Sequence, residues 1–273
     1  MKSIIVPVDF SEQSEYALKI AASLAKEHKA EILVLHMLEL STAMISSAEG
    51  VQVDQAVFFM KLAEKQFETF LDKPYLKDVE VTPIIKHYKV FNEVNEIAEK
   101  HNADMIIMGS HGTDGLKEIF IGSNTEKMVR HSNIPVLVIK EDMPNFKIKN
   151  IVFASNFDQE NLMAYEKASA FANALSAKLE LVYINVPGDN FLSTADAYKK
   201  ITKFLDWAGL GQAVEIYNDY TVEKGILNYS DMVNADLIAI PTHGRKGLSH
   251  FFMGSIGEDI ANHSKIPVVT FKI

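Results

Sequence analysis

The chain has 273 residues, a formal net charge of −9 and no cysteine, and 48% of its residues are hydrophobic. The lack of cysteine excludes disulfides, thiolate metal ligands and cysteine nucleophiles, and the acidic balance argues against a nucleic-acid partner, which clustered Lys and Arg would bind. No apolar run reaches the length of a membrane span, so we expect a cytoplasmic protein with no membrane partner. The length of the chain suits two domains of ordinary size.

Apolar, β-branched runs alternate with helical periodicity in the first part of the chain. The runs predict strands at residues 4–8, 31–38, 79–85, 104–108 and 136–139. A helix is expected after the first strand, with Ser11 as its N-cap and with Glu12 and Glu15 at the positive end of its dipole. Continuous apolar strands joined by helices are typical of a doubly wound, five-stranded parallel sheet covered on both faces, a Rossmann-like α/β domain.

Two further features of this part of the chain concern side-chain packing. His36 lies within the second predicted strand, where we expect a half-buried ring whose hydrogen bonds are satisfied. Phe58, Phe59 and Met60 lie in a segment with helical spacing, which predicts packing in the core or between domains. The alternative for this segment is an exposed patch that binds a partner.

The chain then repeats itself. The sequence HGTDGL at residues 111–116 recurs as HGRKGL at residues 243–248, an offset of 132, and later matches keep that offset. The first strand recurs near residue 150 at an offset of 147, so the second copy has lost about 15 residues after its second strand. The repeat predicts two domains, at residues 1–142 and 146–273, joined by a polar linker that contains proline.

A glycine pattern follows the fourth strand of the first copy. Two residues separate Gly109 from Gly112, and nine residues separate Gly112 from Gly122, which precedes Ser123 at the start of a predicted helix. Glycines allow the backbone to approach an anion closely, and a helix N-terminus directs free N–H groups at negative charge. Since open parallel sheets bind ligands where the strand order reverses, the pattern predicts a phosphate site there, with Asp9 beside it at the end of the first strand.

With this pattern and Asp9, the first copy resembles the universal stress protein family, and the repeat extends the resemblance to the second copy. The resemblance implies an adenine nucleotide alpha hydrolase-like, Rossmann-like fold. The resemblance implies binding of ATP, AMP or ADP, with Mg²⁺ as a companion of the triphosphate. It implies that the glycines and Ser123 surround the phosphates and that Asp9 lies near the adenosine. By the same resemblance the first-copy site contains Asp9, Gly109, Ser110, His111, Gly112, Gly122, Ser123 and Asn124.

The second copy departs from the pattern. Pro241 stands at the place of Gly109 and Asn156 at the place of Asp9, which removes a backbone donor, conformational freedom and a carboxylate. Three residues of the motif remain, so we expect a degenerate or weaker second site on Gly244, Gly254 and Ser255. Tyr88 and Tyr220 stand where members of the family commonly have glycine, which alters the expected nucleoside pocket.

Three functions remain open at this point. The first is a nucleotide-dependent stress-response or signalling module, the second a protein-binding stress factor without nucleotide, and the third a slow ATPase. No catalytic motif and no close spacing of metal ligands occurs, so neither a catalytic residue nor a metal ligand is assigned. The resemblance further implies an internal pseudo-dimer of the two domains, built by residues 136–139 and 268–271, and leaves further homodimerisation open.

Overall fold

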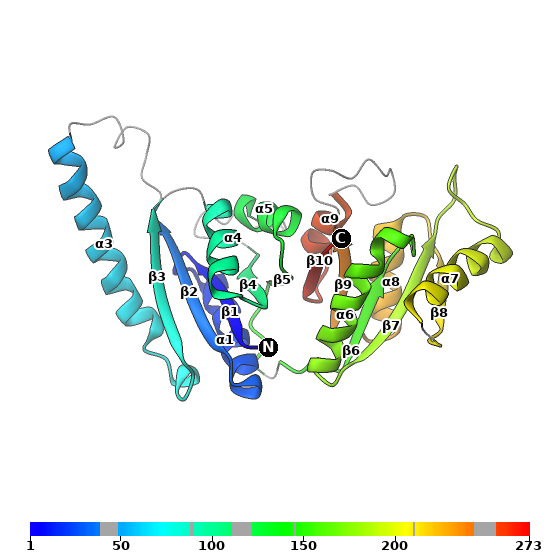
Figure 1. Ribbon diagram of the computed structural model, residues 1–273, viewed down its shortest axis with the longest axis horizontal. Helices are drawn as coiled ribbons and strands as arrows, with labels where there is room; N and C mark the ends of the chain where they lie inside the picture. Colours follow the sequence, from blue (N-terminus) through cyan, green and yellow to red (C-terminus); the bar gives the residue numbers. More distant parts are fainter. Residues whose placement is uncertain (39–48, 88–89, 111–121, 145, 210, 243–254) are drawn as a thin grey trace. The chain divides into compact units, whose positions relative to one another are not determined.

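The computed structural model describes residues 1–38, 49–87, 90–110, 122–144, 146–209, 211–242 and 255–273 (Figure 1). The chain forms two compact units, one built mainly from residues before 147 and the other mainly from residues 147–273. Most of each copy of the repeat falls in one unit.

The first half alternates strands and helices as predicted. Its elements are β1 (Ser3–Val8), α1 (Glu12–His28), β2 (Glu31–Leu38), α3 (Glu49–Leu71), the short 3₁₀ helix η1 (Pro74–Leu76), β3 (Val81–His87), α4 (Val90–His101), β4 (Met105–Gly109), α5 (Ser123–His131) and β5 (Val136–Ile139).

The second half has the same order of strands and α-helices, but it has a short 3₁₀ helix in place of the first turn of α1 and, among the described residues, none between α7 and β8. They are β6 (Asn150–Ala154), η2 (Gln159–Asn161), α6 (Leu162–Ala174), β7 (Lys178–Asn185), α7 (Thr194–Ala208), β8 (Val214–Asn218), α8 (Val222–Met232), β9 (Leu237–Thr242), α9 (Ser255–His263) and β10 (Val268–Lys272).

Each half forms a doubly wound α/β domain, which confirms the predicted fold class. The strand order is β3-β2-β1-β4-β5 in the first half and β8-β7-β6-β9-β10 in the second. The strands pair in parallel within each half, including β1 with β2 and with β4, and helices lie on both faces (Figure 1). The order reverses between β1 and β4, and between β6 and β9, so each half has a switch point.

Helix α1 begins and ends as its sequence predicts. The Ser11 side chain accepts a hydrogen bond from the amide of Ser14, and Glu12 and Glu15 lie in the first turn. Lys29, just past the last turn, adopts a left-handed conformation with φ of 54°. The buried side chains recur at helical spacing and face the sheet, so propensity, capping and burial agree. They are Ser14, Ala17, Leu18, Ile20, Ala21, Ala22, Leu24 and Ala25.

The backbone itself records the duplication. Left-handed residues occur at equivalent positions of the two halves: Phe10 and Phe157, Lys29 and Ser176, and Asn102 and Asn234. These residues are not glycine, and for most side chains a positive φ is unfavourable. Their recurrence indicates that both halves use the same chain reversals.

The structure also corrects details of the prediction. Strand β3 lies two residues later than expected, and β4 lies one residue later. Core packing is wrong for two of the three residues at 58–60, because Phe58 is 64% exposed and Met60 is 38% exposed. The buried stripe of α3 instead contains Ala63, Phe67 and Phe70.

Among the residues that the structure describes, none of the helices combines the length with the apolar character that a bilayer crossing requires.

Candidate functional site

The ends of β1 and β4 meet at the switch point of the first half. These strands are parallel neighbours, with Ile4 opposite Met105 in register, so their carboxyl ends lie at the same edge of the sheet. Asp9 directly follows β1, and Gly109 is the last residue of β4. The edge at which the sequence predicts a phosphate site therefore contains both residues.

The two described arms of the glycine pattern are in direct contact. The amide of Gly122 donates to the carbonyl of Ser110 at 2.6 Å, and the amide of Ser110 donates to the carbonyl of Ile139 at 2.9 Å. The buried Thr125 hydroxyl donates to the carbonyl of Gly109 at 2.9 Å. These bonds hold the start of α5 against the end of β4.

Helix α5 presents its N-terminus at this edge. The carbonyl of Gly122 accepts the amide of Glu126 at 3.0 Å, which makes Gly122 the residue before the first helical turn. Ser123 is the first residue of the helix and is exposed, and Asn124 follows it with partial exposure. Amides in a first turn have no intrahelical acceptor and carry the positive end of the helix dipole, an arrangement that suits an anion.

Gly109 also has a packing role that the sequence did not predict. A β-carbon added at Gly109 would lie 2.7 Å from the backbone carbon and oxygen of Gln13 in the first turn of α1. Such a contact would displace α1 or the end of β4. A glycine is therefore required here by the approach of two backbones, whatever ligand the edge binds.

Asp9 is held in a local turn. Its Oδ1 accepts the amide of Ser11 at 3.1 Å and the hydroxyl of Ser11 at 2.5 Å. Phe10 between them is left-handed, with φ of 64°. Asp and Asn stabilise turns of this type by bonding the backbone two residues later. The turn places a partly buried carboxylate beside the end of β4.

An aromatic cluster lies next to Asp9. The Phe10 ring is 4.4 Å from the His36 ring, 5.1 Å from Phe67 and 5.4 Å from Phe70, measured between centroids. His36 Nδ1 donates to the carbonyl of Val8 at 2.8 Å, which confirms the expected half-buried, hydrogen-bonded ring. Burial lowers the pKa of His36, a shift that the Val8 carbonyl and the Asp9 carboxylate oppose.

Sequence reasoning did not identify Gln13, Phe10 or Thr125 as part of this edge. Thr125 had a usable signal, since it lies two residues after Ser123 in the first turn of a helix. Gln13 and Phe10 had none, because their contributions come from backbone packing and a left-handed φ.

Several predicted site residues lie outside the described residues. They are His111 and Gly112 in the first half and Gly244 and Gly254 in the second. Ser255 is the first residue of α9, the counterpart of α5. Tyr88 also lies outside the described residues, and Tyr220 follows β8 with 84% of its surface exposed.

The corresponding edge of the second half has different chemistry. Pro241 lies within β9, opposite Phe271 of β10. Asn156 is only 4% exposed, and its Oδ1 accepts the amide of Asp158 at 3.0 Å and the side-chain amide of Asn161 at 2.5 Å. The turn of the first half is thus preserved, but its side chain is neutral and already bonded within the protein.

The described residues contain no group of three or more His, Asp or Glu side chains placed to hold a metal ion. In the first half, Asp9 bonds within its turn and His36 packs against Phe10.

Comparison with known families gives two separate matches to one model. Residues 1–140 and residues 147–272 each match the model of the Universal stress protein family. The two matches cover nearly all of the chain and follow the internal repeat.

Individual relatives match one half at a time. Universal stress protein MJ0577 of Methanocaldococcus jannaschii is 35% identical over 153 residues, which is 51% of this chain and 94% of that protein. Universal stress protein MJ0531 of the same organism is 32% identical over 147 residues, 51% of this chain and 82% of that protein.

A solved structure covers both halves together. The crystal structure of a universal stress protein from Archaeoglobus fulgidus DSM 4304 superposes with a TM-score of 0.66 and 23% identity, over 99% of this chain and 96% of that chain. At this level of identity the likeness establishes the fold.

Proposed function

Because the chain belongs to the universal stress protein family in both of its halves, we propose that it is a cytoplasmic stress-response module that binds an adenine nucleotide, ATP or AMP, mainly in its first half. The observation that carries the proposal is the contact between Ser110 and Gly122, which joins the end of β4 to the N-terminus of α5.

The phosphates have a suitable receptor at α5. The first amides of the helix and the exposed Ser123 hydroxyl are donors, and the helix dipole adds positive potential for an anion. Thr125 fixes these donors relative to β4 through its bond to Gly109, so the receptor does not have to be ordered when the ligand binds.

The nucleoside has a suitable acceptor in Asp9. The bond from the Ser11 hydroxyl holds the carboxylate at the switch point, and a carboxylate accepts hydrogen bonds from sugar hydroxyls. Ribose binding by acidic side chains at the corresponding edge is known in other doubly wound folds.

The second half is the weaker candidate. Pro241 has no backbone N–H to donate, and Asn156 is buried and bonded to Asn161. Neither residue supplies the negative charge that Asp9 supplies in the first half. We therefore expect one dominant nucleotide site per chain.

A charge placed at the start of α5 tests the proposal. The variant Ser123→Asp adds a carboxylate where acidic residues favour a helix but repel phosphate. We expect nucleotide affinity, measured by calorimetric titration of ATP and AMP with and without Mg²⁺, to fall by at least about tenfold. Nucleotide released by heating freshly purified protein, identified by chromatography, should fall in parallel.

The matched control is Ser255→Asp, the same change at the first residue of α9. It should leave the dominant affinity within about twofold of the wild type. Equal losses in both variants, or none in either, would contradict the assignment to the first half.

A wild-type chain that neither releases nor binds nucleotide would support the nucleotide-free, protein-binding alternative. That alternative has a surface available on α3, where the apolar side chains of Val57, Phe58 and Leu62 are exposed. Slow ATP hydrolysis is tested in the same samples by phosphate release.

A further inference from the structure

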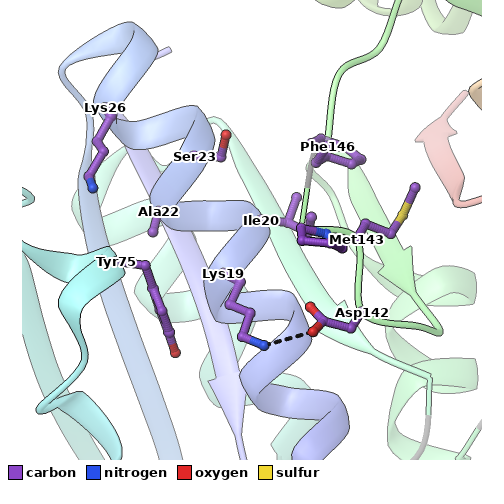
Figure 2. Close-up of a pocket in the computed structure, with 10 residues that line it drawn as sticks. Lys19, Ile20, Ala22, Ser23, Lys26, Tyr75, Asp142, Met143 and Phe146 are labelled. Atoms are coloured by element: carbon purple, nitrogen blue, oxygen red, sulfur yellow. Dashed lines mark hydrogen bonds and ion pairs between the residues drawn. The ribbon is translucent and has the colours of Figure 1, made fainter.

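A second hollow lies on the first half, away from the switch point. It has a volume of about 370 Å³ and is formed by the middle and end of α1, by η1 and by the segment that follows β5 (Figure 2). None of the residues that line it belongs to the candidate phosphate site. Its volume falls in the range of pockets that hold small ligands.

The floor of the pocket comes from one stripe of α1. Lys19, Ser23 and Lys26 are separated by four and three residues, so they lie along one side of the helix. This stripe is opposite in character to the buried face of α1, because Ser23 and Lys26 are exposed. The polar atoms of Ser23 and Lys26 are therefore available to a ligand.

Two apolar walls flank the stripe. The ring of Tyr75 from η1 lies on one side of α1, and Met143 and Phe146 lie on the other, as Figure 2 shows. The Tyr75 hydroxyl is itself buried, and burial raises its pKa, with the Glu15 carboxylate acting in the same direction. Tyr75 therefore stays neutral and contributes a wall rather than a charge.

The charges of the pocket do not cancel. Lys19 Nζ is paired with Asp142 Oδ2 at 3.0 Å. Lys26 also lines the pocket, and no described residue forms an ion pair with it. The lining thus carries one positive charge in excess, on a chain whose net charge is −9. A local positive charge on an acidic protein favours an anionic ligand.

We propose that this pocket binds a small organic anion, with one sulfonate, carboxylate or phosphate group at Lys26 and an apolar body against Met143 and Phe146. The ligand would contact α1 and the segment after β5 together. Binding would therefore hold residues 142–144 and Phe146 against α1, in addition to the ion pair that Lys19 already makes with Asp142.

The probe for this site is 1-anilinonaphthalene-8-sulfonate, an aromatic monoanion whose fluorescence rises in apolar surroundings. It is titrated into the full chain with Mg²⁺ and saturating ATP, which keeps the probe out of the proposed nucleotide site. Lys26→Gln should weaken binding about threefold to fivefold, because it removes the uncompensated charge. Asp142→Asn should strengthen binding by a similar factor, because it releases Lys19 for the anion.

Two further variants complete the test. Lys29→Gln removes an exposed lysine just beyond α1 that does not line the pocket, and it should leave binding unchanged. Phe146→Ala removes part of the apolar wall and should weaken binding about fivefold. Thermal melting of each variant checks that the fold is intact.

Opposite signs for Lys26→Gln and Asp142→Asn would support the proposal. Shifts in the same direction, shifts no larger than that of Lys29→Gln, or the absence of any probe binding in the presence of saturating ATP would overturn it. These outcomes are independent of the proposed nucleotide site, because Ser123→Asp should leave the affinity for the probe unchanged.

Discussion

The ends of β4 and β9 occupy the same place in the two halves but are packed in opposite ways. In the first half, Gly109 lies under the backbone of α1, and Thr125 of α5 reaches over to bond its carbonyl. In the second half the larger residues, Pro241 and Thr242, are on strand β9. The position on helix α9 that is equivalent to Thr125 is Gly257. A β-carbon at Gly257 would lie 3.3 Å from Thr242 Cγ2.

Other positions kept both residue and role. Asp104 and Asp236 each accept backbone amides at the start of the first strand of their half. Ser132 and Ser264 each close the same turn before the last strand, with hydroxyl-to-carbonyl distances of 2.8 and 2.7 Å. The halves therefore agree where the chain only has to fold, and they differ at the edge where one of them is proposed to bind a ligand.

Among the substitutions that test this difference between the halves, Gly109→Ala should have the largest effect on stability. Gly109→Ala should lower the free energy of unfolding by about 2–3 kcal/mol, because the new methyl group meets the backbone of Gln13. Pro241→Ala leaves a β-carbon that the second half already accommodates, so it should cost less than about 1 kcal/mol. Urea denaturation of both variants measures the difference.

Equal costs at the two positions would show that the approach of α1 to β4 is not what requires a glycine. A large cost at Gly109 would also explain why a charge at Ser123 is the better probe of the ligand, since it leaves this packing unchanged.

In the second half the larger residue is on the strand and the glycine is on the helix, so Thr242 and Gly257 should show an energetic coupling. Gly257→Ala gains up to about 1 kcal/mol of helix propensity but must push against the Thr242 methyl group. Thr242→Ser removes that methyl group, so Gly257→Ala should stabilise the Thr242→Ser variant by about 0.5 kcal/mol more than it stabilises the wild type. A double-mutant cycle by thermal or urea denaturation measures this coupling, and a value of zero would contradict the proposed contact.

Local patterns predicted much of the fold. The bounds of β2 and β5, the Ser11 cap and the five strands of each copy follow from apolar periodicity, capping and the repeat. The bounds of β3 and β4 shifted by two residues and one, because strand ends depend on pairing with neighbours rather than on local composition.

The candidate phosphate site was also predictable only in part, because part of it depends on contacts between elements. Residue types and spacing brought Gly109, Ser110 and Gly122 to one edge, and the structure joins them by a hydrogen bond. The role of Gln13 was not predictable, because it arises from the packing of two elements. The ion pair of Lys19 with Asp142 was not predictable for the same reason, because Asp142 is 123 positions away in the sequence.

The two halves should also differ in how their stability depends on pH. His36 in β2 is equivalent to Tyr183 in β7, at the repeat offset of 147. Burial lowers the pKa of His36 below its ordinary value of 6.5, so the unfolded chain binds a proton more readily than the folded chain. The neutral His36 ring therefore makes its full contribution to the free energy of unfolding above pH 6.5. This contribution is lost as the pH falls from 6.5 toward the pKa of His36 in the folded chain.

The variant His36→Tyr copies the second half and should remove this loss, which we expect to be below about 1 kcal/mol. Urea denaturation at pH 7.5 and pH 5.5 measures it as the difference in acid sensitivity between the wild type and the variant. The reciprocal variant Tyr183→His should add acid sensitivity to the second half. If the wild type and His36→Tyr have the same pH dependence, His36 does not lose its proton on folding. The aromatic cluster around Phe10 would then tolerate a charged imidazole.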